Sequence, residues 1–375
     1  MTLLTSAAGT WQLQRYPVRS HDTLQAWEAA DELLHELIIE RDDERPLLMN
    51  DQWGALLMPF AGLDVASQSD SYVSHCGWRH NLQLNQLPDT LTALAPLDPL
   101  PDDRDAVYLK IPKSLSLLEF QLAKLAAELP AGTPIFAAAK SKLITPTVRE
   151  LFSQYCDQLD VSLIRRKCRT IQAVTRSVAL EQERFMSSWD VPEFNLTLHH
   201  HAGVFARNQL DIGARFMLDN MPPVGAEKVI DLGCGNGVLG LQYARLSPAS
   251  HVTFVDESYL AIASTHRNIV SNLPESLVVS DSVKYEFEVD DCLSHQATDS
   301  ADLILCNPPF HQEHAVTEHI ARQMFRDSRR VLRKNGELWV VANRHLPYYQ
   351  PLKRLFKSVH QVAQNSKFVI FQARG

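Results

Sequence analysis

The sequence predicts an α/β fold of two tandem domains, each a mostly parallel sheet covered by helices, related by duplication and with the first copy degenerate. The 375 residues are enough for two domains of common size. In the second half, strand patterns alternate with helix patterns, as in sheets whose crossovers are helices. Similar signals recur in the same order in the first half, as a duplication predicts. We place the domains at residues 1–180 and 181–375.

The elements of the second half follow from short apolar runs bounded by turn residues. The first strand runs into a glycine-rich turn, the second ends at Asp256, and the fourth ends at Asn307. Gly336 marks the turn from a long helix into the last strand. The predicted strands cover residues 228–232, 251–255, 284–289, 303–306 and 337–342, and the predicted helices cover 238–246, 260–272 and 316–332.

Composition indicates a globular protein without a membrane segment. Hydrophobic residues make up 45% of the chain, and apolar runs such as 338–342 are too short to cross a bilayer. No export signal is visible, and the six cysteines form no CxxC pair, so we expect a cytoplasmic protein with free thiols and no metal site. The net charge of −8 argues only weakly against a nucleic-acid partner, because basic residues cluster locally. One cluster comprises Arg165, Arg166, Lys167 and Arg169.

The glycine-rich turn predicts a nucleoside cofactor. Gly233, Gly235 and Gly237 follow a strand and open a helix, where missing side chains let the backbone turn tightly and approach a ligand. Such a turn also serves dehydrogenases, which bind a pyrophosphate there. The carboxylate of Asp231 would repel a pyrophosphate but suits the cationic amino-acid end of S-adenosylmethionine. We therefore favour S-adenosylmethionine.

Two further carboxylates stand where the rest of that cofactor would lie. Asp256 ends the second strand, where it can accept both ribose hydroxyls, and Asp291 follows the third strand, where it can take the adenine amino group. The alternative is that both residues only cap helices or turns.

A compact motif at the end of the fourth strand predicts a pocket for a planar amine. It consists of Asn307, Pro308, Pro309 and Phe310. The Asn307 side-chain oxygen and the Pro308 carbonyl can each accept one hydrogen of an exocyclic NH2 group, which turns the nitrogen lone pair toward the cofactor methyl. Phe310 offers a ring face for a flat base. The alternative is an ordinary Pro-Pro loop, which the glycine turn upstream makes less favoured.

Residues 199–213 carry weaker signals. Three consecutive histidines, 199–201, lie on a predicted strand over residues 194–201, whose side chains alternate faces, so they cannot converge on one metal ion. Phe205 and Gly213 could line the mouth of the cofactor site. An equally favoured interpretation is a plain helix start with Asp211 as its cap.

The first half repeats the landmarks of the second without its chemistry. Four residues match four others without a gap: Ser71, Tyr72, Asn81 and Asn85 against Ser258, Tyr259, Asn268 and Asn272. Asn50 and Gln52 replace the first two glycines of the turn, so side chains stand where a cofactor would approach. Ile111 replaces Asn307. We therefore expect the first domain to position a large substrate or a partner.

With these motifs in hand, the chain resembles the two-domain bacterial guanine-N2 methyltransferases of ribosomal RNA, along nearly its whole length. Residues 24–32, 210–216 and 342–346 resemble the large-subunit (23S) branch. The resemblance implies tandem Rossmann-like methyltransferase domains, S-adenosylmethionine as donor and one guanine N2 amine as acceptor. It assigns Gly233, Gly235 and Asp256 to the cofactor and residues 307–310 to the base. Asp290 and Asp291 depart from the amides of relatives.

These predictions combine into direct in-line methyl transfer to a base that has left its stack, with the N-terminal domain positioning the RNA. No metal, membrane or evident oligomeric partner is expected. Other functions stay open: N2-guanine methylation of 16S rRNA, methylation of adenine N6 or a protein glutamine, a nicotinamide-dependent oxidoreductase, and a non-catalytic RNA-binding protein. Asp231 and the motif at 307–310 argue against the last two.

Overall fold

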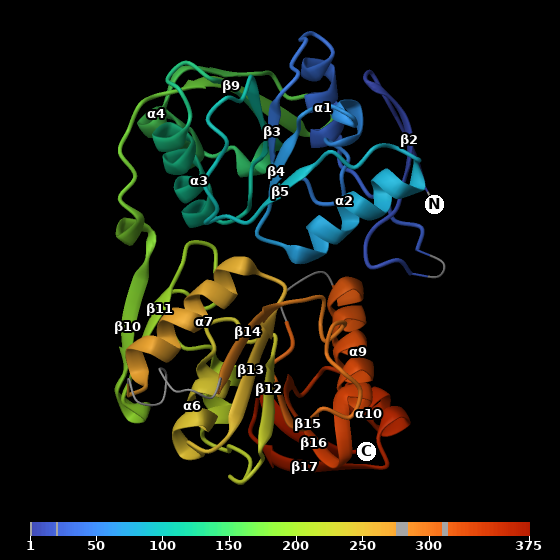
Figure 1. The fold of residues 1–375 in the computed structure, drawn as a ribbon, viewed down its shortest axis with the longest axis vertical. Helices are drawn as coiled ribbons and strands as arrows, with labels where there is room; N and C mark the ends of the chain where they lie inside the picture. The colour runs from blue at the N-terminus through green and yellow to red at the C-terminus, as the bar shows by residue number, and fades with distance from the viewer. Residues whose placement is uncertain (1, 20–21, 275–283, 310–313) are drawn as a thin grey trace. The chain divides into compact units, whose positions relative to one another are not determined.

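The computed structural model describes residues 2–19, 22–274, 284–309 and 314–375 (Figure 1). The chain forms two compact units, which meet in the sequence between Phe185 and Met186. Each unit contains a seven-stranded mixed sheet with helices on its faces. The predicted α/β class is therefore confirmed.

The C-terminal unit has the strand order β14-β13-β12-β15-β16-β18-β17. The first five strands run parallel. Strand β18 lies antiparallel beside β16, and the edge strand β17 pairs antiparallel with β18. Apolar side chains pack on both faces of this sheet under the helices. The strands are β12 (Lys228–Leu232), β13 (His251–Asp256), β14 (Tyr285–Val289), β15 (Ala301–Cys306), β16 (Leu332–Asn343), β17 (Ser358–Gln364) and β18 (Phe368–Arg374), and the helices are α5 (Ile212–Leu218), α6 (Val238–Leu246), α7 (Tyr259–Asn272), α9 (His314–Val331) and α10 (Tyr349–Leu355).

The N-terminal unit repeats that order as β5-β4-β3-β6-β7-β9-β8, as the predicted duplication requires. A two-stranded hairpin precedes each sheet: β1 (Thr2–Ser6) with β2 (Gly9–Leu13), and β10 (Ser187–Val191) with β11 (Leu196–His200). The remaining strands are β3 (Pro46–Met49), β4 (Ala66–Gln68), β5 (Thr92–Leu94), β6 (Ala106–Lys110), β7 (Pro134–Lys140), β8 (Cys156–Val161) and β9 (Cys168–Thr175), and the helices are α1 (Ala29–Ile38), α2 (Tyr72–Leu84), α3 (Leu115–Glu128) and α4 (Pro146–Tyr155).

The matched asparagines make equivalent hydrogen bonds to a hairpin in both units. In α7, Asn268 accepts a hydrogen bond from the backbone N–H of His199 at 2.6 Å and donates to its carbonyl at 3.0 Å. In α2, Asn81 accepts from the backbone N–H of Gln14 and donates to its carbonyl, both at 2.9 Å. The next asparagine along each helix repeats the pattern two residues earlier in the strand. Each hairpin is thus bound to its unit by side-chain amides that replace a neighbouring strand.

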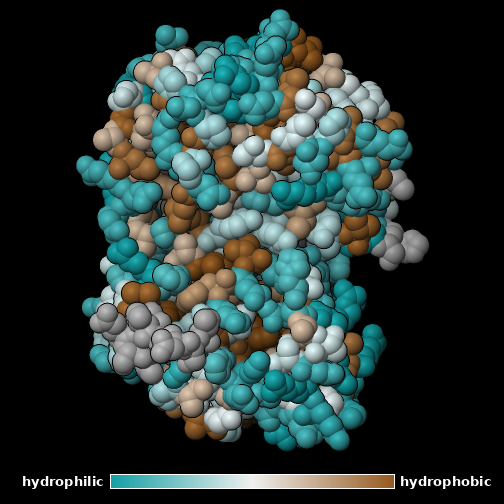
Figure 2. Space-filling model, viewed as in Figure 1, coloured by the Kyte–Doolittle hydropathy of each residue, from teal (hydrophilic) through white to brown (hydrophobic). Residues whose placement is uncertain are grey.

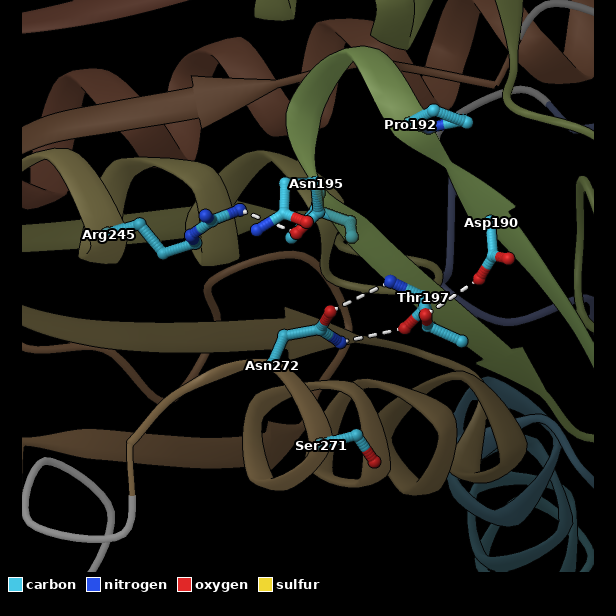
Figure 3. A pocket seen from close by; sticks show the side chains of 8 residues that line it. Asp190, Pro192, Asn195, Thr197, Arg245, Ser271 and Asn272 are labelled. Atoms are coloured by element: carbon cyan, nitrogen blue, oxygen red, sulfur yellow. Dashed lines mark hydrogen bonds between the residues drawn. The ribbon is translucent and has the colours of Figure 1, made fainter.

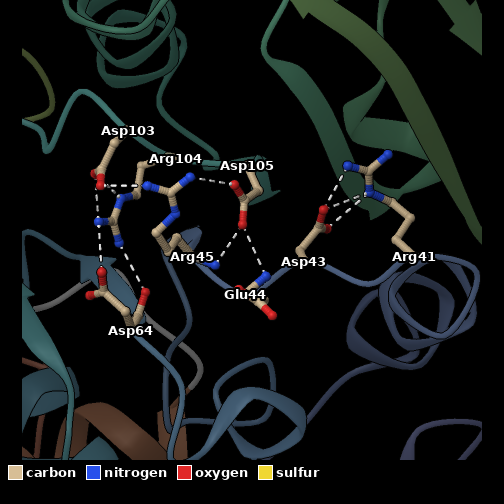
Figure 4. A network of polar contacts seen from close by, with 8 residues as sticks. All are labelled: Arg41, Asp43, Glu44, Arg45, Asp64, Asp103, Arg104 and Asp105. Carbon is tan, nitrogen blue, oxygen red and sulfur yellow. Dashed lines mark hydrogen bonds and ion pairs between the residues drawn. The ribbon is translucent and has the colours of Figure 1, made fainter.

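A polar network ties the amino ends of the central strands in the N-terminal unit (Figure 4). The buried Arg104 donates to Asp64 at 3.2 Å and to Asp103 at 2.7 Å. Arg45, just before β3, pairs with Asp103 and with Asp105, just before β6. This network lies at the sheet edge opposite to the carboxyl ends of the strands, where ligands bind in such folds. It therefore serves the fold.

Several predicted boundaries differ from the structure by one or two residues, and two differences have a clear local cause. Gly336 lies inside β16 rather than in a turn before it, and the left-handed Asn335 (φ 70°) makes the local irregularity beside β15. The strand expected over 194–201 begins only at Leu196, because Pro192–Phe194 forms a 3-10 turn and Asn195 is left-handed (φ 49°).

No helix among the described residues is long and apolar enough to span a bilayer. On the face drawn in Figure 2, polar and apolar side chains alternate over the described surface of both units. Scattered apolar side chains of this kind are normal for a globular protein.

Candidate active site

The glycine-rich turn leaves the carboxyl end of β12 with three left-handed glycines: Gly233 (φ 68°), Gly235 (φ 58°) and Gly237 (φ 75°). A Cβ added at Gly237 would approach the stiff Thr265 side chain to 2.5 Å, so packing requires that glycine. A Cβ added at Gly233 would approach only the flexible end of Met324, to 2.9 Å, and there the left-handed backbone favours glycine. At Gly235 no described atom lies within 4 Å of that position. The turn therefore keeps open backbone at Gly235, where a ligand can approach.

Asp256 stands at the end of β13, beside this turn. Its Oδ2 accepts a hydrogen bond from the Gly235 N–H at 2.8 Å, and its Oδ1 accepts from the Ser258 N–H at 3.0 Å. Burial raises the pKa of the carboxyl, and the backbone donors oppose the rise. Each oxygen can accept a second hydrogen bond. The Glu257 N–H also interacts with this carboxylate. Asp256 thus stiffens the turn and keeps acceptor capacity that ribose hydroxyl groups can use.

Asp231 lies behind the turn, on β12. It is 1% exposed, and its Oδ2 accepts a hydrogen bond from the Gly240 N–H at 2.8 Å. Burial raises the pKa of this carboxyl to about 7, although the bond from Gly240 lowers it. The carboxyl is therefore close to half ionised at neutral pH, and a nearby cation would favour its charged form.

The two acids after β14 have different surroundings. Asp290 is fully buried and accepts from the backbone N–H of His295 at 2.8 Å, so it organises the turn. Asp291 is half-buried, and its Oδ1 accepts from the Gln323 amide of α9 at 2.9 Å. Burial raises the pKa of Asp291, against the hydrogen bond from Gln323. No motif in the sequence indicated the part played by Gln323, because α9 lies far along the chain.

Asn307 follows β15, whose Cys306 pairs with Leu232 at the start of the glycine turn. Its Nδ2 donates to Asp211 Oδ2 at 3.1 Å. Its Oδ1 is buried and has no hydrogen-bond partner among the described residues. A buried acceptor without a donor is rare in proteins and often marks a functional group. Pro308 is buried and Pro309 half-buried, whereas Phe310 lies outside the described residues.

Gly213 and Phe205 have separate places. Gly213 is buried in α5, and a Cβ there would stand 3.3 Å from Asn307 Oδ1. Asp211 caps that helix by accepting from the Ala214 N–H at 2.9 Å, as the alternative interpretation predicted. Phe205 is 59% exposed. The structure thus brings Gly213 to the base motif rather than to the glycine turn.

The three histidines do not converge. His200 is fully buried and bonds through Nε2 to the Asn236 amide at 2.9 Å, and Trp189 stacks on its ring. Burial lowers the pKa of His200 to about 4. The described ranges contain no cluster of three metal-ligating side chains.

Known families match both halves of the chain. A methyltransferase small domain matches residues 195–372, and an RLMG N-terminal domain matches residues 1–177. Proteins named ribosomal RNA large subunit methyltransferase G are similar over full length. The one from Aeromonas salmonicida is 45% identical over 99% of each chain. The one from Yersinia pestis is 41% identical over 100% of this chain and 94% of its own.

The chain belongs to the ribosomal RNA large subunit methyltransferase G family. The resemblance inferred from its motifs is confirmed. A solved T. thermophilus 16S rRNA N2 G1207 methyltransferase, in complex with AdoMet and guanosine, shares the fold with a TM-score of 0.78. It is 20% identical, and the match covers 100% of this chain and 97% of that one.

In the N-terminal unit, side chains of the chain itself occupy the place that corresponds to the glycine turn. Asn50 is left-handed (φ 60°), like the glycine it replaces. Its amide exchanges hydrogen bonds with the Gln121 amide at 2.9 and 3.0 Å and donates to the Lys110 carbonyl at 2.9 Å. The Lys110 ammonium binds the buried Asp31 at 2.9 Å. These internal contacts occupy the groups that a cofactor would need.

The tip of the β8–β9 hairpin carries the basic cluster defined by Arg165, Arg166, Lys167 and Arg169. Arg165 pairs with Glu36 at 2.6 Å, and Arg166 pairs with Glu32, both from α1. The two arginine side chains remain 59% and 52% exposed. Exposed pairs of this kind contribute little stability, so they can be exchanged for another anion.

A shallow pocket of about 530 Å³ lies beside β11 and α7 (Figure 3). Two of its polar side chains already bond to backbone: Asn272 bonds to the Thr197 backbone at 2.9 and 2.8 Å, and Arg245 donates to the carbonyl of Phe194 at 2.6 Å. We assign it to the packing of the hairpin. It is lined by Asp190, Pro192, Asn195, Leu196, Thr197, Arg245, Ser271 and Asn272.

Proposed function

We propose that this chain transfers a methyl group from S-adenosylmethionine to the N2 amine of one guanine in large-subunit ribosomal RNA, in the cytoplasm. Membership of the family supports rRNA methylation. The observation that carries the choice of an amine is the buried Asn307 Oδ1, an acceptor without a donor among the described residues, next to the glycine turn. An exocyclic NH2 group supplies the missing donor.

The residues around the turn fit S-adenosylmethionine. Gly235 offers open backbone, Asp256 has acceptor capacity for the ribose hydroxyls, and Asp231 can balance the cationic amino-acid end. We assign Asp291 to the adenine amine, Gly233 and Gly237 to the shape of the turn, and Phe205 to the mouth of the site. When bound, the cofactor supplies a methyl group already activated on a sulfonium.

The base motif would then orient the acceptor. Asn307 Oδ1 and the Pro308 carbonyl would each take one amine hydrogen, Pro309 would fix the backbone, and Phe310 would stack on the base. This arrangement holds the nitrogen lone pair toward the methyl group and provides alignment rather than a strong base. The guanine would leave its stack to enter.

The N-terminal unit is proposed to position the RNA. Its counterpart of the cofactor site is filled by Asn50 and Gln121, so its role lies elsewhere. The basic hairpin tip offers guanidinium groups that can leave their carboxylate partners for phosphates.

The test uses the purified chain, methyl-labelled S-adenosylmethionine, and 23S and 16S rRNA from cells lacking the gene. We expect label in 23S rRNA only, recovered as N2-methylguanosine after digestion. Label recovered as N6-methyladenosine, in 16S rRNA or in protein would refute the proposed acceptor. Calorimetry with S-adenosylmethionine and with NADH separates a methyltransferase from an oxidoreductase, because only the proposed donor should bind.

A further inference from the structure

We infer that Asp211 is a positioning residue that sets the orientation of the Asn307 amide, and with it the preference of the pocket for an amine over a carbonyl. The inference rests on the proposed function. Asp211 is half-buried at the start of α5, 96 residues before Asn307 in the sequence. Its effect on the reaction would pass entirely through Asn307.

The hydrogen bonds fix which end of the amide faces Asp211. The Ala214 N–H, which can only donate, points at Oδ2 of Asp211 at 2.9 Å. Oδ2 is therefore an acceptor, and the group of Asn307 that meets the same atom at 3.1 Å must be its NH2. The amide oxygen is consequently turned the other way, where no described donor reaches it.

The orientation decides what the pocket can recognise. With Oδ1 free, Asn307 accepts a hydrogen bond and selects a donor such as an exocyclic amine. With the amide flipped, it would donate and select a ring carbonyl instead. A Cβ added at Gly213 would stand 3.3 Å from Oδ1, so α5 runs near this oxygen, and the missing side chain leaves room for the amide.

The degenerate unit supports a separate role for the acid beyond capping. There Glu28 occupies the N-cap of α1, as Asp211 does for α5. The residue that corresponds to Asn307 in this unit is Ile111, which has no side-chain amide. The Glu28 carboxylate binds Lys140 at 2.8 Å instead. The N-cap residue of α1 and that of α5 are therefore both acidic, but only in the C-terminal unit does this acid bond to an asparagine.

Three variants of the full chain separate orientation from capping. Asp211→Ser keeps a good N-cap but is one bond too short to hold Asn307. Asp211→Asn can place its oxygen where Oδ2 stands and retain both bonds. Asp211→Ala loses both. For each we would measure the single-turnover methyl transfer rate on 23S rRNA, the Kd for S-adenosylmethionine, and the melting temperature.

We expect Asp211→Ser to lower the transfer rate roughly 10- to 100-fold, the effect of losing one hydrogen bond to a charged group. Its Kd for S-adenosylmethionine and its melting temperature should stay near wild type, and Asp211→Asn should restore the rate. A wild-type rate in Asp211→Ser would overturn the inference, as would a loss of cofactor binding parallel to the loss of rate. A wild-type chain that methylates no rRNA would instead refute the proposed function.

Discussion

The replacement Asp256→Ser should strongly weaken S-adenosylmethionine binding while leaving the fold intact, because the chain already contains a natural version of this change. In the N-terminal unit, Ser69 stands two residues before Ser71, as Asp256 stands before Ser258. Its Oγ accepts from the Ser71 N–H at 3.2 Å, where Asp256 Oδ1 accepts from Ser258 at 3.0 Å. A serine therefore sustains this turn at the end of the second strand.

The expected loss follows from the hydrogen bonds. Two ribose hydroxyls bonded to a carboxylate contribute about 1.5–3 kcal/mol each, so about 3–6 kcal/mol are lost together. That corresponds to a Kd for S-adenosylmethionine about 10²- to 10⁴-fold higher. The Gly235 N–H also loses its partner, which loosens the turn by roughly 1 kcal/mol.

Titration calorimetry measures the affinity, and thermal melting followed by circular dichroism checks the fold. The matched control is Ser69→Ala, which removes the equivalent bond in the degenerate unit and should leave cofactor affinity unchanged. A Kd for Asp256→Ser within about threefold of wild type would refute the ribose contact. An equal loss of affinity in Ser69→Ala would show that the effect is general destabilisation.

Asn307→Ala should bind S-adenosylmethionine normally but transfer methyl groups on the order of 10²-fold more slowly, and near-normal single-turnover rates would exclude its role. Cofactor affinity should rise between about pH 5.5 and 7 by up to about tenfold per pH unit, because the Asp231 carboxyl with a pKa of about 7 must ionise to meet the cation. Its raised pKa also means that the stability contributed by Asp231 falls as pH rises from about 4 to about 7. Calorimetry and melting of Asp231→Asn should show a weaker dependence on pH for both affinity and stability than the wild type shows. Neutralising the basic hairpin tip should flatten the slope of log K against log salt for RNA binding by roughly 0.7–0.9 for each phosphate that the variant no longer binds. An unchanged slope in filter binding would show that the RNA does not contact this tip.

Local patterns in the sequence were enough to predict most of the C-terminal sheet. The strand before the glycine turn and helix α6 have the predicted bounds, because an apolar run, three glycines and a short amphipathic segment define them locally. Position 336 misled the prediction, since a glycine marks a turn only where the chain reverses, and here it sits within an irregular strand.

The side-chain partners at the site could not be predicted in the same way. Asp211 was recognised as a helix cap, yet its bond to Asn307 depends on how α5 packs beside the end of β15. Likewise, the sequence shows the basic cluster but gives no sign that Glu32 and Glu36 of α1 pair with Arg166 and Arg165. Such interactions join residues far apart in the chain, and periodicity carries no information about them.

The duplication provides an internal comparison that separates fold from function. Positions that keep both the residue and its hydrogen bond in the two units serve the fold. Serines cap α2 and α7, and the paired asparagines hold the hairpin of each unit. Positions that keep the backbone but change the side chain mark the chemistry that is missing from the first unit. Asn50 retains the left-handed backbone of Gly233 while its amide fills the space, and Ser69 retains the turn bond of Asp256 without its charge. The degenerate unit thus lacks the groups that would meet a ligand while preserving those that meet the backbone, which is the pattern expected if Asp256 and Asn307 are maintained for binding rather than for folding.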